Sequence, residues 1–366
     1  MSAAVDKSSP LPAFANAEIL VVGGAGFVGS NLVRALLAAN PVRVRVVDNL
    51  LSAERKNLPD DPRVEFIEAS ITDDSVLAGL NDDLDYVFHL ATYHGNQSSI
   101  ADPLADHANN TLTTLKLFDR IARFVRLKKV VYASAGCTVA EKTADLAKPT
   151  TEDAPVGLYH DSPYQVSKLI GEFYGNYYFG RYKMPFVKAR FQNVYGPGEI
   201  LGAGRWRGTP ETVWRNVTPT FVWRSLAHEA LPLENAGQAT RDFIFVEDIV
   251  DGLMRCAAFG DAGGVYNLAS GAETTIAELA ELINRLTGNP TPPDIKPARD
   301  WDRSIRRVGA TEKARDHLGF VARTKIEDGL ARTIVWTREN VRMIEAAMTK
   351  HAGKVRAPRI SEIGKF

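Results

Sequence analysis

Short apolar runs alternate with helix-length segments along the first half of the chain. Strands that are buried on both faces are apolar throughout, whereas a helix repeats its apolar positions every three or four residues. Leu112, Leu115 and Ile121 follow the helical spacing in the long segment before the fifth apolar run. The pattern predicts six strands separated by helices, within residues 18–24, 42–48, 64–70, 85–91, 128–134 and 186–196.

This alternation predicts an α/β fold with a doubly wound, mostly parallel Rossmann sheet, because helices must cover both faces of such a sheet. After about Pro197 the rhythm changes to a stretch rich in Gly, Arg and Trp, followed by shorter elements. We therefore expect a flexible lead, a dinucleotide-binding domain, a smaller C-terminal α/β substrate domain and a polar tail. The expected boundaries are 1–16, 17–196, 197–345 and 346–366, with residues 241–260 returning to the first domain.

Composition narrows the possible partners. The 366 residues carry 44 basic and 44 acidic side chains, so neither nucleic acid nor an anionic membrane is an expected partner. The first residues lack the pattern of a signal peptide, so we expect none, and no apolar run reaches membrane-spanning length. Cys137 and Cys256 cannot form a disulfide framework and lack metal-ligand spacing, and the seven histidines show no metal motif. We expect a cytoplasmic protein without a metal.

The stretch GGAGFVG, residues 23–29, follows the first strand and opens a helix. Glycines at three-residue spacing permit a tight turn, the approach of a pyrophosphate and close packing of the helix on the strand. The free N–H groups of the helix N-terminus then face the phosphates. A second strand ends at Asp48, about 20 residues further on, where a ribose-binding carboxylate belongs. The alternative is a glycine turn without a ligand.

Asp48 favours NAD over NADP, because a carboxylate accepts hydrogen bonds from both ribose hydroxyls and repels a 2′-phosphate. Arg55 lies close enough in the sequence to leave the NADP alternative open.

Tyr164 and Lys168 stand four residues apart in a segment with helical periodicity, so both side chains share one helical face. An ammonium beside a phenol stabilises the phenolate and lowers the pKa of the tyrosine. Such a tyrosine can take the proton of a sugar hydroxyl while a hydride leaves the carbon for nicotinamide. The alternative is an ordinary exposed helix pair.

The chain resembles the extended short-chain dehydrogenase/reductase family, and within it the NAD-dependent nucleotide-sugar epimerases and dehydratases. The resemblance runs over roughly residues 18 to 330. It rests on GGAGFVGSNL, VVDNL, FHLA, NNT, YAS, PYQVSK, RFQNVYGP, TPTF, RDFIFVEDIV, YNLASG and a late arginine cluster.

The resemblance implies a set of binding residues. Around the cofactor it places Gly23, Gly26, Phe27, Val28, Gly29, Asp48, Asn49, Ser70, Ile71, Leu90, Ala91, Thr92 and Asn109, together with Tyr164 and Lys168. Around a nucleotide-diphosphate sugar it places Asn193, Thr218, Arg241 and either Arg306 or Arg307. Two loop residues are further candidates: we expect His94 to approach the sugar and Arg205 to grip the diphosphate, and the alternative for Arg205 is an interface or packing loop. The family usually has an Asp where Ser70 stands, which weakens the adenine contact.

The stretch YASAGCTVAE departs from the family pattern, because Ala135 stands where a catalytic Ser or Thr is usual. Ser134 or Thr138 is the candidate replacement for that hydroxyl. Cys137 falls where dehydratases carry an acid/base residue and where GDP-mannose 3,5-epimerases carry a cysteine, and a thiol can exchange protons beside a ketone. The alternative is a small buried cysteine. The Asp-Glu pair of the dehydratases is absent.

The resemblance therefore implies a redox-neutral NAD-dependent epimerase that works through a transient 4-keto sugar, closest to the UDP-sugar 4-epimerases. The alternatives are a GDP-sugar 3,5-epimerase-like enzyme using Cys137, a dehydratase, decarboxylase or 4-keto reductase, and a non-enzymatic NAD sensor. Members of the family often form homodimers through two long helices, for which the segments 110–127 and 164–182 are the candidates.

Overall fold

In the computed structural model, the described residues are 6–93, 95–136, 148–200, 216–298 and 305–352. The central element is a seven-stranded parallel sheet with the order β11-β6-β5-β4-β1-β2-β3. Its strands are β1 (Glu18–Val22), β2 (Arg43–Asp48), β3 (Val64–Glu68), β4 (Tyr86–His89), β5 (Lys129–Ala135), β6 (Phe186–Phe191) and β11 (Val265–Leu268). The strand order reverses between β1 and β4, which is the crevice of a doubly wound sheet.

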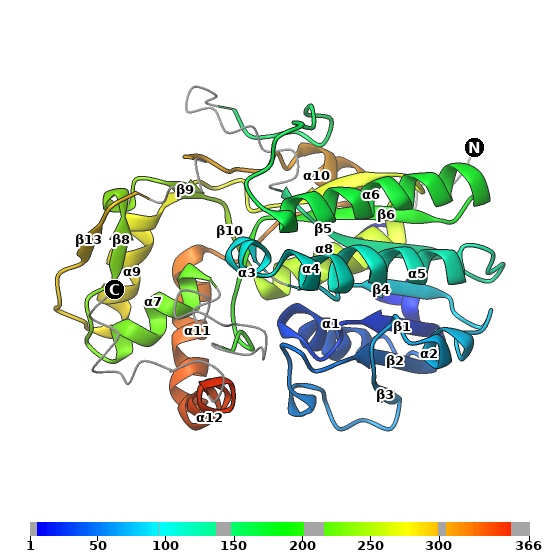
Figure 1. The fold of residues 1–366 in the computed structure, drawn as a ribbon, viewed down its shortest axis with the longest axis horizontal. Coiled ribbons are helices and arrows are strands. Elements are labelled where there is room, and N and C mark those ends of the chain that lie inside the picture. The colour runs from blue at the N-terminus through cyan, green and yellow to red at the C-terminus, as the bar shows by residue number, and fades with distance from the viewer. Residues whose placement is uncertain (1–5, 94, 137–147, 201–215, 299–304, 353–366) are drawn as a thin grey trace.

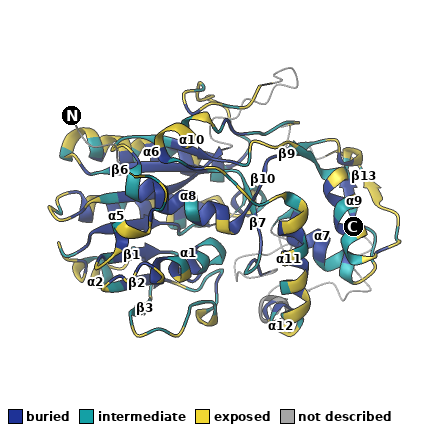
Figure 2. Cartoon of the chain, turned by 180° about the vertical axis from the view of Figure 1, so that it is seen from behind, coloured by how far each residue is buried: buried dark blue, intermediate teal, exposed yellow. Residues whose placement is uncertain are grey.

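Helices cover both faces of this sheet, and its strands other than the edge strand β3 are largely buried between them (Figures 1 and 2). One face packs against α1 (Phe27–Leu37), α8 (Val246–Phe259) and α10 (Glu312–Leu318). The other face packs against α2 (Asp74–Ala78), α5 (Thr113–Ile121) and α6 (Pro163–Tyr182). Buried strands explain the continuous apolar runs of the sequence.

Three short helical elements precede α5. They are α3 (Asn96–Ala101), α4 (Pro103–Asp106) and the π-helix η3 (His107–Leu112). Single 3-10 turns are formed by η1 (Leu11–Phe14), η2 (Arg55–Asn57) and η6 (Asn235–Gly237).

A smaller unit lies at one end of the molecule, beside the main sheet and its helices, on the left in Figure 1. Its helices are α7 (Val217–Leu226), α9 (Ile276–Thr287), α11 (Ile326–Glu339) and α12 (Val341–Ala352). Its paired strands are β8 (Pro232–Glu234) with β13 (Asp294–Lys296), and β9 (Thr240–Arg241) with β12 (Thr274–Thr275). β7 (Asn193–Tyr195) pairs with β10 (Phe243–Phe245), which joins the end of the sixth predicted strand to the RDFIF segment.

The chain returns to the main sheet over a longer segment than the expected 241–260. α8 packs on the sheet, β11 pairs with β6 as the seventh strand, and α10 packs on the same face as α8, so the return also includes β11 and α10. The four-residue run VYNL is too short for its sequence alone to indicate which sheet it joins.

The described parts of the two terminal segments are packed. Phe14, within the expected flexible lead, lies in the core, and the Arg255 guanidinium donates a hydrogen bond to the Lys7 carbonyl at 2.8 Å. At the other end, α12 continues into the expected tail and buries Ala347. Single apolar residues anchor both segments. The mostly polar composition of the two segments did not indicate this packing.

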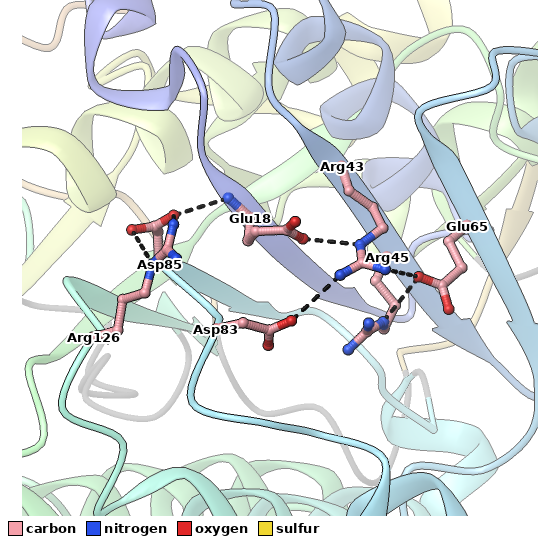
Figure 3. A network of polar contacts seen from close by, with 7 residues as sticks. All are labelled: Glu18, Arg43, Arg45, Glu65, Asp83, Asp85 and Arg126. Carbon is pink, nitrogen blue, oxygen red and sulfur yellow. Dashed lines mark hydrogen bonds and ion pairs between the residues drawn. The ribbon is translucent and has the colours of Figure 1, made fainter.

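An ion-pair network lies at the amino edge of the main sheet (Figure 3). The Arg43 guanidinium is its centre and contacts the carboxylates of Glu18 at 2.9 Å, Glu65 at 3.1 Å and Asp83 at 3.3 Å. Asp85 accepts hydrogen bonds from the Glu18 backbone N–H at 2.9 Å and from Arg126 at 3.1 Å. These contacts fasten the starts of neighbouring strands at the edge opposite the carboxyl ends.

Of the helices that the described residues form, none combines the length and the apolarity needed to cross a membrane.

Candidate active site

A cavity of about 850 Å³ lies between the carboxyl edge of the main sheet and the smaller unit. The size is within the usual range for ligand sites, and the position is the one that ligands occupy in open α/β sheets. All the residues expected around the cofactor line it, namely Gly23, Gly26, Phe27, Val28, Gly29, Asp48, Asn49, Ser70, Ile71, Leu90, Ala91, Thr92, Asn109, Tyr164 and Lys168.

The glycine loop packs too closely for any side chain at two of its positions. Gly23 has a φ of +83°, and a Cβ there would lie 2.5 Å from the backbone nitrogen of Ala91. A Cβ on Gly29 would lie 2.3 Å from the Gly23 carbonyl oxygen. No side chain caps the following helix, α1, at Gly26. A bare helix start behind a side-chain-free loop fits the pyrophosphate of a dinucleotide.

Asp48 links the end of β2 to that loop. Its carboxylate accepts hydrogen bonds from the backbone N–H groups of Ala25 at 3.0 Å and Leu50 at 2.9 Å. Burial raises the pKa of Asp48, and these hydrogen bonds oppose the rise. The carboxylate of Asp48 therefore lines the cavity and also orients the glycine loop. The spacing in the sequence indicated the first role but not the second.

The π-helix η3 shapes the part of the cavity near Thr92. It places Asn109 on the cavity wall and turns Asn110 inward. The Asn110 Oδ1 atom accepts hydrogen bonds from the Thr92 hydroxyl at 3.1 Å and the Tyr93 N–H at 2.6 Å. Single π-helical turns are frequent at functional sites, and this one fixes the loop after β4.

Tyr164 and Lys168 lie on the first turns of α6, whose N-terminus is defined by Ser162 as the N-cap and Pro163. The Lys168 Nζ atom donates a hydrogen bond to the Ala133 carbonyl at 2.8 Å and lies 5.8 Å from the centroid of the Tyr164 ring. The Ser99 hydroxyl accepts a hydrogen bond from the Tyr164 backbone N–H at 3.0 Å. Lys168 is 3% exposed, so its ammonium acts in a largely water-free environment.

His89 lies behind this pair and is fully buried, with its Nε2 atom 2.9 Å from the Thr114 hydroxyl. Burial and the nearby charge of Lys168 lower the pKa of His89 to about 3. The imidazole is therefore neutral at physiological pH, in keeping with a packing role.

Ser134 lines the cavity, but its hydroxyl is directed to a buried ion pair. It donates a hydrogen bond to the Glu172 carboxylate at 2.6 Å, and Glu172 contacts the Arg190 guanidinium at 2.8 Å. A serine hydroxyl whose proton is held in this way can still accept a hydrogen bond through its oxygen.

Only some of the residues expected around the substrate line the cavity in the structure. Asn193, Thr218 and Arg241 line the cavity. Arg306 does not, because its guanidinium pairs with Glu273, with Nε 2.6 Å from Oε1. Its neighbour Arg307, the other arginine considered, lines the cavity instead. His94, Arg205 and Cys137 lie outside the described residues.

Several polar cavity residues were not found from the sequence. Most of them belong to loops, to short strands or to α7, and their positions depend on how the smaller unit packs. These polar residues include Gln192, Glu199, Asn216, Arg224, Glu234 and Asn235.

Comparison with known proteins identifies the family of the chain. The model of the NAD dependent epimerase/dehydratase family matches residues 19–269. The chain belongs to this family. The protein is therefore an enzyme of the NAD-dependent epimerase/dehydratase class, and the predictions of the family, of the Rossmann fold and of NAD as the cofactor are confirmed.

Three similar family members cover nearly the whole chain. The chain is 33% identical to the UDP-glucose 4-epimerase of Mycolicibacterium smegmatis, over 87% of this chain and 98% of that protein. It is 32% identical to a dTDP-glucose 4,6-dehydratase of an Actinoplanes species, over 88% and 98%. The crystal structure of the Bordetella bronchiseptica enzyme WbmF in complex with NAD+ and UDP is 60% identical, with a TM-score of 0.83 over 94% and 99% of the two chains.

Proposed function

We propose that the protein is an NAD-dependent UDP-sugar 4-epimerase. The observation that carries the proposal is the placement of Tyr164 and Lys168 in one cavity with the glycine loop and the cationic side chains Arg241 and Arg307. The similarity to UDP-glucose 4-epimerases and to WbmF, crystallised with NAD+ and UDP, supports both the cofactor and the nucleotide.

In the proposed reaction the phenolate of Tyr164, which the ammonium of Lys168 stabilises, accepts the proton of the C4 hydroxyl and becomes a phenol. The residues of the glycine loop and Asp48 would hold NAD, which would supply the acceptor and donor of the C4 hydride, so that the reaction would consume no reductant. The 4-keto sugar turns its other face between the two transfers, and the phenol of Tyr164 gives its proton back to the new hydroxyl. Ser134 supplies an acceptor for the substrate hydroxyl.

The dehydratase alternative lacks its acid/base pair, because Gly136 and Cys137 stand where that pair is expected. The 3,5-epimerase alternative depends on Cys137, which lies outside the described residues. A dehydratase, a 3,5-epimerase, a decarboxylase and a 4-keto reductase would each form a different product.

The proposal is tested by incubating the protein with UDP-, GDP-, dTDP- and CDP-sugars and identifying the products by NMR. We expect interconversion of C4 epimers of a UDP-sugar, with a deuterium label at C4 retained in the product and no net NADH. Loss of water or of CO₂ would contradict a 4-epimerase. Solvent deuterium at C3 or C5 would favour the mechanism based on Cys137, and Cys137→Ser would then abolish that exchange.

We also propose that the protein forms a homodimer through α5 and α6. Val166, Phe173 and Tyr177 lie along one face of α6 and are 42%, 55% and 56% exposed. An apolar stripe of this kind on a long helix is typical of a surface covered by a second copy.

A cytoplasmic location is proposed as well. The described cysteine, Cys256, is a free and fully buried thiol, which agrees with a reducing compartment.

A further inference from the structure

Asp242 is a fully buried carboxylate between β9 and β10, and it accepts four hydrogen bonds. Its Oδ1 atom accepts from the backbone N–H of Ser270 at 2.9 Å and from the Ser270 hydroxyl at 2.7 Å. Its Oδ2 atom accepts from the N–H groups of Gly271 at 3.0 Å and Gly309 at 3.3 Å. One side chain thus connects the turn after β11 with the segment 305–309.

The backbone of Asp242 connects two further segments. Its N–H donates to the Arg307 carbonyl at 3.0 Å, and its carbonyl accepts from the N–H of Asn193 at 2.9 Å. β7, the β9–β10 junction, the turn after β11 and the segment 305–309 therefore meet at this single residue.

Several residues carried by these segments line the cavity, among them Asn193, Arg241 and Arg307. Side chains in extended backbone alternate between two sides. Arg241 and Phe243 line the cavity, whereas Asp242 between them is turned to the interior. In the neighbouring segment Arg307 lines the cavity and Arg306 pairs with Glu273 instead.

The chemistry of this end of the cavity is suited to a diphosphate. Guanidinium groups recognise phosphate oxygens through paired N–H donors, provided that the groups are held in position. Holding two cations near each other requires that their segments be fixed against mutual repulsion before the ligand arrives. The four hydrogen bonds to one buried carboxylate provide such fixation.

We propose that Asp242 is a positioning residue for the diphosphate end of the cavity, and that it acts by fixing the segments that carry Asn193, Arg241 and Arg307. It makes no contact with the substrate in this proposal. The inference rests on the proposed function, because the ligand that these residues receive is the nucleotide-diphosphate sugar.

The test is Asp242→Asn, studied in the NAD-saturated protein with UDP as the probe. The amide replaces one acceptor oxygen by an NH₂ group, so either the N–H groups of Gly271 and Gly309 or the N–H group of Ser270 lose their acceptor. A lost set of buried hydrogen bonds is expected to weaken UDP binding about tenfold or more. We expect calorimetry to show this loss, while the NAD retained on desalting stays within about twofold of wild type. The KM for the UDP-sugar should rise with little change in kcat.

Asp248→Asn is the matched control. Asp248 is also buried and accepts hydrogen bonds from the backbone N–H groups of Arg323 and Thr324, both at 3.0 Å, but it does not line the cavity. The same substitution there is expected to lower stability and to leave UDP affinity unchanged. Ser270→Ala, which removes one of the four donors to Asp242, gives a milder test if Asp242→Asn does not fold.

The outcomes distinguish a failure of the positioning role of Asp242 from a failure of the proposed function. Weaker UDP binding in Asp242→Asn or Ser270→Ala, with UDP affinity retained in Asp248→Asn, supports the positioning role. Equal UDP affinity in wild type and in the folded Asp242 or Ser270 variant overturns it, as does an equal loss in the Asp248 control. If wild type itself does not bind UDP, the proposed function falls, and the inference falls with it.

Discussion

The phenol of Tyr164 is the group on which the proposed chemistry depends. Tyr164→Phe keeps the ring but removes the oxygen that must take the proton of the sugar hydroxyl. General acid–base catalysis by one side chain contributes about 100- to 10,000-fold, so kcat is expected to fall by that factor while NAD is retained. Initial rates of C4 epimer interconversion, followed by NMR, measure the change.

Tyr132→Phe is the control for this substitution. The Tyr132 ring centroid lies 5.3 Å from the Lys168 Nζ atom, and its hydroxyl donates a 3.4 Å hydrogen bond to the Lys168 carbonyl. Tyr132 is buried and does not line the cavity. Losing a neutral hydrogen bond costs about 1 kcal/mol, so the rate should fall less than tenfold. Equal losses in the two variants would mean that Tyr164 acts through packing.

At the residue scale, sequence reasoning succeeded where a motif fixes the spacing. The glycine loop and Asp48 belong to one strand–loop–helix–strand unit, so their shared place could be predicted. The choice between Arg306 and Arg307 could not, because it depends on which side of an extended segment faces the cavity. The partner of the Ser134 hydroxyl was also hidden, since Glu172 is 38 residues away in the chain.

At the scale of elements, the glycine loop and α1 form one packing unit. Gly29→Ala places a Cβ 2.3 Å from the Gly23 carbonyl oxygen and 2.7 Å from the Gly24 Cα, so α1 must move away from β1. Displacing the N–H groups that face the pyrophosphate should weaken NAD binding about tenfold or more. The NAD content of the purified variant, with a titration of added NAD, measures the effect.

Gly180→Ala is the matched control for the glycine loop. Gly180 is exposed in α6, and a Cβ there meets no atom within 4 Å. Alanine in a helix interior is favoured over glycine by about 0.5–1 kcal/mol, so this variant should be slightly more stable and should bind NAD as wild type does. Normal NAD binding in Gly29→Ala would show that the close approach is not required.

The inner strands of the main sheet could be predicted because they are largely buried on both faces and read as mainly apolar runs, whereas the edge strand β3 is only partly buried. The pairs β8–β13 and β9–β12 have two or three residues per strand, too few to establish a period. The π-helix η3 has a wider turn than an α-helix, and the apolar pattern of the sequence does not distinguish the two. The smaller unit was therefore expected as a unit, but its elements were not.

At the scale of the whole molecule, the apolar face of α6 predicts the oligomeric state. Phe173→Glu places a charge in the middle of the proposed homodimer contact, and we expect a dimeric wild type to become monomeric by light scattering. Val335→Glu is the control, because Val335 is similarly exposed, at 52%, on α11. A monomeric wild type, or dissociation of both variants, would contradict the proposed contact.

The ion-pair network at the amino edge predicts how stability depends on pH (Figure 3). Burial alone would raise the pKa of Asp85, but hydrogen bonds from Arg126, Lys128 and the Glu18 N–H outweigh it and hold the pKa of Asp85 below its usual value. A carboxylate with a lowered pKa in the folded state stabilises the protein above its unfolded pKa of about 3.9, and this contribution is lost as the pH falls through the folded value.

Asp85→Asn tests this dependence, because the amide keeps the shape and removes the titrating charge. Breaking a buried, hydrogen-bonded charge should cost about 2 kcal/mol at pH 7 and pH 5, measured by urea unfolding. The difference from wild type should shrink below about pH 4, where the carboxylate of wild type is progressively protonated. Asp83→Asn, at a carboxylate that is 36% exposed, should change stability by less than about 1 kcal/mol. A difference between wild type and Asp85→Asn that stays constant down to pH 3 would show that the charge of Asp85 does not stabilise this edge of the sheet.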